Sequence, residues 1–403
     1  MAKQNEYKEK VHTVLCARFG DKTPKAFVHT YGCQGNVADS EHIKGMLVEM
    51  GYELCNAPEE ADIIIYNTCA IREHAEDRVF GNVGALKRLK SENPNLIIAL
   101  CGCMVQQPHI TEKLKESYPF VSLIFGTHVL HRLPELLSKV LCSGKRVFCI
   151  DDSDGVIAEG MPNSRDSGEN AWLPIMYGCN NFCTYCIVPY VRGRERSRDP
   201  ETVLFEAKQL INQGYKKLTL LGQNVNCCGK DSETGVDFSE LLKRIDAIEG
   251  DFTFDFMTSH PRDCSERLID TLASSKHFCG HLHLPVQSGN NRILKEMNRH
   301  YTRERYLELV HYAKEKMPDI DLTTDIIVGF PGETYEEFLD TVSLVKEVEY
   351  GSMFTFIFSP RNGTRAASMP DPVPKAEKSR WFSELLKVQE EIAARHKAEE
   401  NIK

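Results

Sequence analysis

Three cysteines in the middle of the chain have a spacing that suits an iron–sulfur cluster. Cys179, Cys183 and Cys186 lie in the stretch Cys179-Asn-Asn-Phe-Cys183-Thr-Tyr-Cys186. Each of three thiolates on one short loop can bind a different iron of a four-iron cluster, which leaves the fourth iron open to a small molecule. One-electron reduction of that molecule then starts radical chemistry. A structural zinc site is the alternative, but its fourth ligand would have to come from elsewhere in the fold.

A second set of three cysteines is spread evenly over the first part of the chain. Cys33, Cys69 and Cys103 are separated by 36 and 34 residues, and each follows a predicted strand. If these strands are parallel, the three thiols emerge at the same carboxyl edge of a sheet, where such sheets bind ligands. They would then hold a second cluster, although three unrelated buried thiols would give the same pattern. Cys101 competes with Cys103, and we choose Cys103 because it follows Gly102 on the loop.

The composition is that of a folded protein with reduced cysteines. The chain has 403 residues, of which 41% are hydrophobic and 27% are charged, and its 15 cysteines are an odd number. Residues 1–10 are charged and lack the apolar core of a secretory signal. We therefore expect a cytoplasmic protein without a membrane span, whose cysteines bind metal rather than form disulfides. The net charge of −9 excludes a globally basic nucleic-acid binder and allows a local basic patch.

The first part of the chain alternates short β-branched runs with helical patterns. Strands are predicted over 26–31, 62–67, 96–101, 121–125 and 146–150, and helices over 39–50, 73–90, 112–117 and 134–141. Over residues 25–150 this alternation predicts an α/β domain with a doubly wound parallel sheet. We expect residues 1–24 to be a polar lead-in with one helix. We expect residues 151–171 to be a solvated linker, because acidic and turn-forming residues are concentrated there.

A second alternating series occupies residues 172–371. Strands are predicted over 173–177, 217–221, 253–257, 281–284, 322–328 and 353–358. Six strand–helix units predict a partial (β/α)6 barrel. Thr334 and Glu337 have the spacing of a capping box at the start of one of its helices. Residues 372–403 are expected to form a charged C-terminal helix.

Many motifs, in the right order, make the chain similar to the radical S-adenosylmethionine (SAM) methylthiotransferase family. The resemblance covers about residues 25–370. The motifs of the first domain are Tyr31-Gly-Cys-Gln-Gly-Asn36, Asp39-Ser-Glu41, Asn67-Thr-Cys-Ala-Ile-Arg-Glu73 and Cys101-Gly-Cys103. Those of the second are Gly178-Cys179 through Arg198, Leu221-Gly-Gln-Asn-Val-Asn226, Thr258-Ser-His-Pro261, Leu282 through Gly289 and Thr324 through Glu333. Two departures are Gly35, where Met is common, and Cys227-Cys228, where Ser-Tyr is usual.

The resemblance implies an enzyme that inserts a methylthio group at C2 of N6-isopentenyladenosine, next to the anticodon of a tRNA. It implies two [4Fe-4S] clusters. A radical SAM cluster would be held by Cys179, Cys183 and Cys186, with SAM on its open iron, and an auxiliary cluster by Cys33, Cys69 and Cys103. The implied partners are the tRNA anticodon stem-loop and an electron donor such as a flavodoxin or ferredoxin. Family members also carry a C-terminal RNA-binding TRAM domain, which we expect to be absent from this chain.

Further candidate contacts follow from their positions beside these sites. Gln223, Asn224 and Gln287 follow predicted barrel strands, where relatives hold SAM, although a polar turn is the alternative. The segment Arg192-Gly-Arg194-Glu-Arg196-Ser-Arg198 is assigned to RNA, because phosphates require local positive charge; a solvated loop with internal ion pairs is the alternative. The patch would be extended by Arg292, Lys295, Arg299, Arg303 and Arg305. No catalytic residue is assigned beyond the cluster ligands.

Two other functions stay open on the sequence alone. The first is the same chemistry on threonylcarbamoyl-adenosine of tRNA or on a ribosomal protein. The second is a non-catalytic two-cluster electron carrier or scaffold, which would not cleave SAM. Three cysteines leave one iron of each cluster without a protein ligand. This argues against the electron carrier, since such proteins usually have fully ligated clusters.

Overall fold

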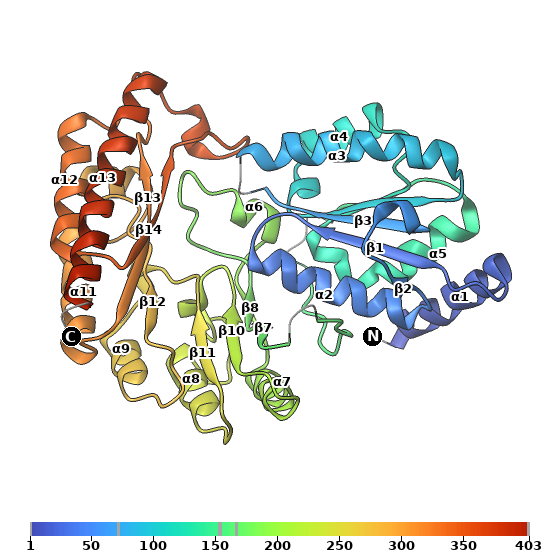
Figure 1. Cartoon of the computed structure of the whole chain (residues 1–403), viewed down its shortest axis with the longest axis horizontal. Helices are drawn as coiled ribbons and strands as arrows, with labels where there is room; N and C mark the ends of the chain where they lie inside the picture. The colour runs from blue at the N-terminus through green and yellow to red at the C-terminus, as the bar shows by residue number, and fades with distance from the viewer. Residues whose placement is uncertain (1, 71–72, 152–154, 166–167, 401–403) are drawn as a thin grey trace. The chain divides into compact units, whose positions relative to one another are not determined.

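The computed structural model describes residues 2–70, 73–151, 155–165 and 168–400, and it divides the chain into two compact units (Figure 1). The first unit contains Met1–Gly168 and Val188–Arg194, and the second contains Glu169–Ile187 and Glu195–Lys403. Each unit is α/β, as predicted. Residues 188–194 belong to the first unit although they follow Cys186 closely along the chain.

The first unit is built on a six-stranded sheet in the order β2-β1-β3-β4-β5-β6, in which all neighbours are parallel. The strands are β1 (Lys25–Thr30), β2 (Glu53–Leu54), β3 (Ile63–Thr68), β4 (Ile97–Gly102), β5 (Leu123–Phe125) and β6 (Val147–Cys149). Of these six strands, only the two-residue β2 is not predicted from the sequence. Every residue of β3 and β4 is buried, which is typical of a parallel sheet covered on both faces. The strand order reverses between β1 and β3, which is the position where doubly wound sheets bind ligands.

Helices cover both faces of this sheet (Figure 1). Alternate strand residues such as Ile63 and Ile65 pack with α1 (Ala2–Phe19), α2 (Gln34–Glu49) and α5 (Leu133–Ser143). The residues between them, such as Ile64, pack with α3 (Glu73–Glu92) and α4 (Pro108–Ser117). Successive side chains of each strand point to opposite faces of the sheet, and they therefore pack into two separate hydrophobic cores.

Two segments are more tightly packed than the sequence indicates. Helix α1 is more than a polar lead-in, because Val11 and Leu15, four residues apart on one face, are buried in the core with α2 and α5. Within the expected linker, the described residues 161–165 contact α2. There Arg165 forms an ion pair of 2.9 Å with the buried Glu41, and a Cβ on Gly45 would lie 2.6 Å from the Pro162 carbonyl carbon. Residues 152–154 and 166–167 of that linker lie outside the described residues.

The second unit contains the six predicted strands in two parallel sheets, β7-β10-β11 and β12-β13-β14. They are β7 (Asn170–Pro174), β10 (Lys217–Leu221), β11 (Thr253–Phe256), β12 (His281–His283), β13 (Asp321–Val328) and β14 (Ser352–Ile357). A parallel bridge from Phe254 in β11 to Phe278, just before β12, joins the two sheets. The spatial order follows the chain order, as in the predicted partial barrel.

Helices alternate with these strands and complete the unit. They are α7 (Pro200–Asn212), α8 (Phe238–Asp246), α9 (Glu266–Ala273), α10 (Asn291–Glu296), α11 (Arg303–Lys316) and α12 (Tyr335–Val348). The predicted capping box is present, with Thr334 as the N-cap of α12 and Glu337 as its partner. The C-terminal helix α13 (Lys375–Glu400) stacks Trp381 on Phe338 of α12 with ring centroids 5.5 Å apart. Among the described helices, none is long and apolar enough to cross a membrane.

Candidate metal centres

The ends of three neighbouring strands place Cys33, Cys69 and Cys103 at one edge of the first sheet. Cys33 follows β1 after a two-residue loop, and Cys69 and Cys103 directly follow β3 and β4. Strand β3 lies between β1 and β4, and Thr68 at its end pairs with Gly102 at the end of β4. Because the strands are parallel, their carboxyl ends share an edge. Cys101, in contrast, lies within β4 and is part of the hydrophobic core.

Gly32 allows the β1 loop to approach the second of these thiols closely. Its φ of +116° is unfavourable for other residues, and a Cβ at this position would lie 2.4 Å from Cys69 Cβ and 2.7 Å from Cys69 Sγ. Any larger residue would therefore push the loop away from Cys69. Glycine at this point keeps Cys33 and Cys69 on adjoining parts of the sheet edge.

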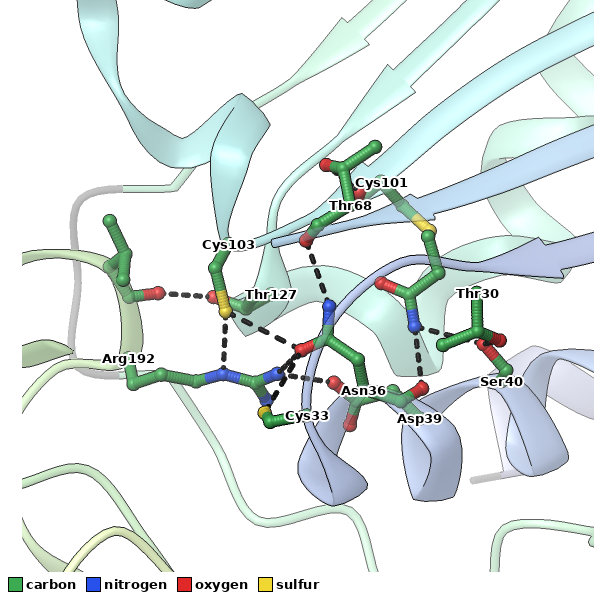
Figure 2. Close-up of polar contacts among 12 residues, drawn as sticks. Thr30, Cys33, Asn36, Asp39, Ser40, Thr68, Cys101, Cys103, Thr127 and Arg192 are labelled. Atoms are coloured by element: carbon green, nitrogen blue, oxygen red, sulfur yellow. Dashed lines mark hydrogen bonds and ion pairs between the residues drawn. The ribbon is translucent and has the colours of Figure 1, made fainter. Parts of the chain in front are cut away.

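The Asn36 side chain fixes the ends of two strands around the thiols. Its Nδ2 donates to the carbonyl oxygens of Tyr31 (3.0 Å) and Thr68 (2.9 Å), which follow β1 and end β3. Its Oδ1 lies 3.8 Å from both Cys33 Sγ and Cys103 Sγ (Figure 2). Asn36 is fully buried, so these hydrogen bonds are made out of contact with solvent. One amide thus positions two of the three cysteines relative to the backbone of the third.

Arg192 brings a buried positive charge to the same place. Its Nε donates to Cys103 Sγ over 3.0 Å, and an Nη2 hydrogen donates to Asn36 Oδ1 over 2.8 Å (Figure 2). The same Nη2 lies 2.7 Å from Asp39 Oδ2 in an ion pair. The Arg192 side chain is only 8% exposed. A guanidinium stays charged in proteins, so this edge of the sheet contains a fixed cation.

The electrostatic surroundings keep the Cys103 thiol protonated in the protein without metal. Burial raises the pKa of the Cys103 thiol to about 12, Arg192 opposes this rise, and Cys33 and Cys69 add to it. The thiol is therefore the stable form until a metal displaces the proton. Cys33 is the N-cap of α2, where the helix dipole favours negative charge. Three thiols, a helix N-terminus and a buried cation together fit an iron–sulfur cluster.

The other three cysteines lie on a loop that helix α10 holds in place. Cys179 follows the short strand β8 (Met176–Tyr177) after Gly178. Asn298, just after α10, donates from Nδ2 to the carbonyl oxygens of Asn181 and Phe182, each over 3.1 Å. Phe182 has a φ of +46°, which turns the chain between Cys179 and Cys183. These contacts fix the loop without using the thiols.

A second buried arginine contacts this loop. Arg299 is only 4% exposed, and its Nη1 donates to Cys183 Sγ over 3.4 Å. Its Nη2 donates to the Pro285 carbonyl oxygen over 2.6 Å and its Nε to Tyr301 Oη over 3.0 Å. Burial raises the pKa of Cys179 to about 12. Both trios of cysteines therefore combine buried thiols with one arginine that donates to a sulfur.

Neither trio is gathered around a single point. Among the residues that the structure describes, no three Cys, His, Asp or Glu side chains are grouped to hold one metal ion. A [4Fe-4S] cluster takes one thiolate for each of three irons, so its three cysteines need not meet at one metal ion.

The predicted SAM contacts lie at the ends of barrel strands. Gln223 Oε1 accepts from the Gly178 backbone N–H over 2.5 Å, next to Cys179. Asn224 is buried; its Nδ2 donates to Asp263 Oδ2 and to Cys227 Sγ, both over 2.9 Å, and its Oδ1 has no hydrogen-bond partner among the described residues. Gln287 is buried with a φ of +70°. An unpartnered buried acceptor such as Asn224 Oδ1 is suited to a polar ligand.

Two of the four neighbouring arginines that are predicted to contact RNA are buried. Arg192 is buried against Cys103, and Arg198 is buried with Nη1 donating to the Pro174 carbonyl oxygen over 2.7 Å and to Glu206 over 2.9 Å. Burial keeps both guanidinium groups from phosphates. Arg194 is exposed and Arg196 is partly exposed, so they stay candidates for RNA.

The predicted extension of the basic patch is largely neutralised. Arg299 is buried at Cys183. Three of the others are paired with carboxylates, namely Arg292 with Glu337, Arg303 with Glu347 and Arg305 with Glu308, and Lys295 is exposed.

Sequence reasoning did not identify Asn36, Asp39 or Arg299 as parts of the sites. Asn36 and Asp39 lie in the motif that follows Cys33, three and six residues beyond it. Because α2 begins at Gln34, not at residue 39 as predicted, both residues lie in its first two turns beside the thiols. A prediction that the helix begins directly after Cys33 would have placed Asn36 and Asp39 beside the thiols. Arg299 had no such local signal, because 116 residues separate it from Cys183.

Comparisons with known proteins agree with the architecture. The model of the radical SAM superfamily matches residues 173–345, and that of the uncharacterized protein family UPF0004 matches residues 25–126. The structure of the radical SAM methyltransferase TsrM from Kitasatospora setae has a TM-score of 0.61 at 14% identity, and covers 86% of this chain and 75% of that one. The cobalamin-dependent radical enzyme OxsB has a TM-score of 0.57 at 14% identity, covering 92% and 56%. At such low identity these structures show the fold alone.

The sequence relatives are much more similar. A protein of Caldicellulosiruptor saccharolyticus named tRNA-2-methylthio-N(6)-dimethylallyladenosine synthase is 55% identical over 364 residues, which are 90% of this chain and 77% of the relative. A protein of Clostridium botulinum with the same name is 54% identical over 369 residues, or 92% of this chain and 82% of the relative. The chain therefore belongs to the radical SAM methylthiotransferase family, in the branch of the tRNA-2-methylthio-N(6)-dimethylallyladenosine synthases, enzymes that use SAM and [4Fe-4S] clusters.

Proposed function

We propose that this protein inserts a methylthio group at C2 of N6-isopentenyladenosine, next to the anticodon in the stem-loop of a tRNA. The relatives of 53–55% identity carry the name of this activity. The observation that carries the proposal is the meeting of Cys33, Cys69 and Cys103 at the carboxyl edge of the first sheet. A second trio on a separate loop gives the chain the two cluster sites that the reaction needs.

Each trio is assigned one [4Fe-4S] cluster. Cys179, Cys183 and Cys186 would hold the radical SAM cluster, and Cys33, Cys69 and Cys103 the auxiliary cluster. When bound, these groups supply chemistry that amino-acid side chains lack, namely a radical derived from SAM and a sulfur for transfer to an unactivated carbon. Two trios with reduced thiols suit the cytoplasm, where thiols are kept reduced.

The chain's own residues position ligands around these sites. Asn224 offers a buried, unpartnered Oδ1 to SAM, and Gln223 holds the peptide of Gly178 next to Cys179. Gln287 lies four residues after the end of β12, where it forms a bridge with Ile326 of β13, and it is assigned to the same ligand. Asp263 fixes the amide of Asn224, so that Oδ1 keeps its direction. These residues bind and orient and do not themselves take part in bond making.

Contact with tRNA is assigned to Arg194 and Arg196. Arg194 is exposed, and phosphates dominate the affinity of proteins for nucleic acids. A base must leave its stack before an enzyme can modify its ring, and the anticodon loop is single-stranded, which lowers the cost of that step. The electron that starts the reaction would come from a small redox protein such as a flavodoxin or ferredoxin.

An anaerobic assay tests this function. The purified protein is reconstituted with iron and sulfide and incubated with SAM, a reductant and an isopentenylated anticodon stem-loop RNA. We expect the RNA to gain the mass of a methylthio group in place of hydrogen, as measured by mass spectrometry. An RNA carrying threonylcarbamoyl-adenosine and the ribosomal protein substrate serve as parallel samples. Modification of either one instead of the isopentenylated RNA would contradict the proposal, and so would the absence of SAM cleavage.

A further inference from the structure

Arg192 lies on a short segment, residues 188–194, that folds with the first unit although its neighbours in the sequence fold with the second. Residues 188–194 cluster with the first unit, while the residues before and after them cluster with the second. The segment is anchored by a hydrogen bond of 2.7 Å from Thr127 Oγ1 to the Val191 carbonyl oxygen (Figure 2). This anchor sits next to Arg192 and fixes its backbone.

The guanidinium of Arg192 is held in one orientation by partners from two elements. Asn36 of α2 accepts a hydrogen bond from its Nη2 over 2.8 Å, and Asp39 of α2 lies 2.7 Å from the same Nη2 in an ion pair. Cys103 at the end of β4 accepts from its Nε over 3.0 Å. A buried charge is costly unless it is paired. These partners are therefore needed to keep the arginine in its buried position. In the protein without metal, the carboxylate of Asp39 forms an ion pair with the cation.

The charges change when the three thiols become ligands. Bound cysteines are thiolates, so three negative charges appear around a cation that is already paired with Asp39. Net charge and hydrogen bonds to the sulfurs are two of the factors that set the reduction potential of an iron–sulfur cluster. An N–H donor on Cys103 Sγ and a buried positive charge both favour the more negative, reduced cluster.

We propose that Arg192 is a positioning residue of the auxiliary cluster, whose guanidinium holds the Cys103 thiolate and raises the reduction potential of the cluster. This inference rests on the proposed function, because it assumes that Cys33, Cys69 and Cys103 hold a cluster. Arg192 thus serves the cluster and not the RNA. Both charge and shape matter, since a lysine would keep the charge but lose the planar fork that reaches Cys103, Asn36 and Asp39 together.

The test isolates the auxiliary cluster in the full-length chain. Cys179, Cys183 and Cys186 are all changed to Ala, and the reconstituted protein should keep about four irons. Arg192→Gln, Arg192→Lys and Arg88→Gln are then made in this background. Arg88 is an exposed control in the last turns of α3, where it forms an exposed ion pair with Glu92. The midpoint potential for one-electron reduction by dithionite is measured from the electron paramagnetic resonance signal of the reduced cluster.

The outcomes separate the inference from the proposed function. We expect a lower midpoint potential for Arg192→Gln, a smaller decrease for Arg192→Lys and no change for Arg88→Gln. Loss of iron from Arg192→Gln but not from Arg192→Lys would also support the role of the charge. An unchanged potential with full iron in Arg192→Gln would overturn the inference. Loss of iron from both Arg192 variants, but not from Arg88→Gln, would support the holding of Cys103 by the planar fork, which a lysine cannot replace. A background protein without iron would instead overturn the auxiliary cluster itself, and the inference with it.

Discussion

The Nε–H of Arg192 donates to the sulfur of Cys103 over 3.0 Å, although 89 residues separate the two along the chain. Arg299 makes the corresponding contact with Cys183 in the second unit, over 3.4 Å. Both arginines are buried, and both also donate to backbone or amide oxygens that fix their direction. Each group of candidate ligands is therefore built with its own counter-charge, which removes two arginines from the surface that could bind RNA.

Replacement of Cys33, Cys69 and Cys103 by Ala should halve the iron content of the reconstituted protein. We expect about eight irons in the wild type and about four in the triple variant. SAM cleavage should persist, because the Cys179 loop is untouched, whereas methylthiolation should be lost. Cys101→Ala is the matched control, since this thiol lies in the core one strand position before Gly102, and it should keep all eight. Eight irons in the triple variant would show that the cluster is held elsewhere.

Gly32→Ala should prevent assembly of the auxiliary cluster. The added Cβ meets Cys69 Cβ at 2.4 Å, and the φ of +116° is strained for alanine by about 1–3 kcal/mol. We expect about four irons and a lower urea midpoint of unfolding. Gly144→Ala separates the two causes, because Gly144 also has a positive φ, of +65°, but its Cβ would have no atom within 4 Å. Loss of iron from Gly144→Ala as well would assign the effect to stability and not to the contact with Cys69.

Asn36→Ala should destabilise the first unit. The substitution removes the donors to the Tyr31 and Thr68 carbonyl oxygens in a fully buried place, and a buried group left without a partner costs about 1–3 kcal/mol. We expect the free energy of unfolding in urea to fall by that amount in the protein without metal. Asn163→Ala, at an exposed position, is the control and should change it by less than about 0.5 kcal/mol. Equal stabilities of wild type and Asn36→Ala would mean that water replaces the amide.

The stability of the second unit should decrease as the pH rises from 5 to 8, through Glu333. Burial raises the pKa of Glu333 to about 7, although its Oε2 accepts from the backbone N–H of Gly329 over 2.6 Å and of Phe330 over 3.1 Å. The folded protein therefore binds this proton more tightly than the unfolded chain does. The stabilisation is complete below the ordinary pKa of 4.5, and about 3 kcal/mol of it is lost as the pH rises through 7.

Glu333→Gln should remove this pH dependence from urea unfolding curves of the full-length chain. The exposed neighbour Glu336 provides the control, and Glu336→Gln should keep the wild-type slope between pH 5 and 8. A slope that is the same in all three proteins would show that Glu333 titrates near its ordinary value in the folded state.

The sheet edges could be predicted from the sequence. Contacts between residues far apart in the sequence could not. Apolar β-branched runs at regular spacing gave the strands that end before Cys33, Cys69 and Cys103, since each run is short and bounded by turn-forming residues. A row of arginines near a cluster loop suggested RNA, because the sequence carries the charge of Arg192 but not its burial. Its burial depends on residues 188–194 returning to the first unit, and on Asp39 and Asn36 being placed by a helix that starts five residues earlier than predicted.

The split course of the first unit affects how the protein can be divided into separately produced fragments. A recombinant piece ending at Gly168 would contain every strand of the first sheet, yet it would lack residues 188–194, which include helix α6 (Val188–Arg192). Asp39 would then lose the guanidinium that faces it, and the Thr127 hydroxyl would lose its acceptor on Val191. The metal site of such a fragment would therefore differ from that of the full chain. Adding the missing seven residues as a separate peptide would be the natural way to restore the site.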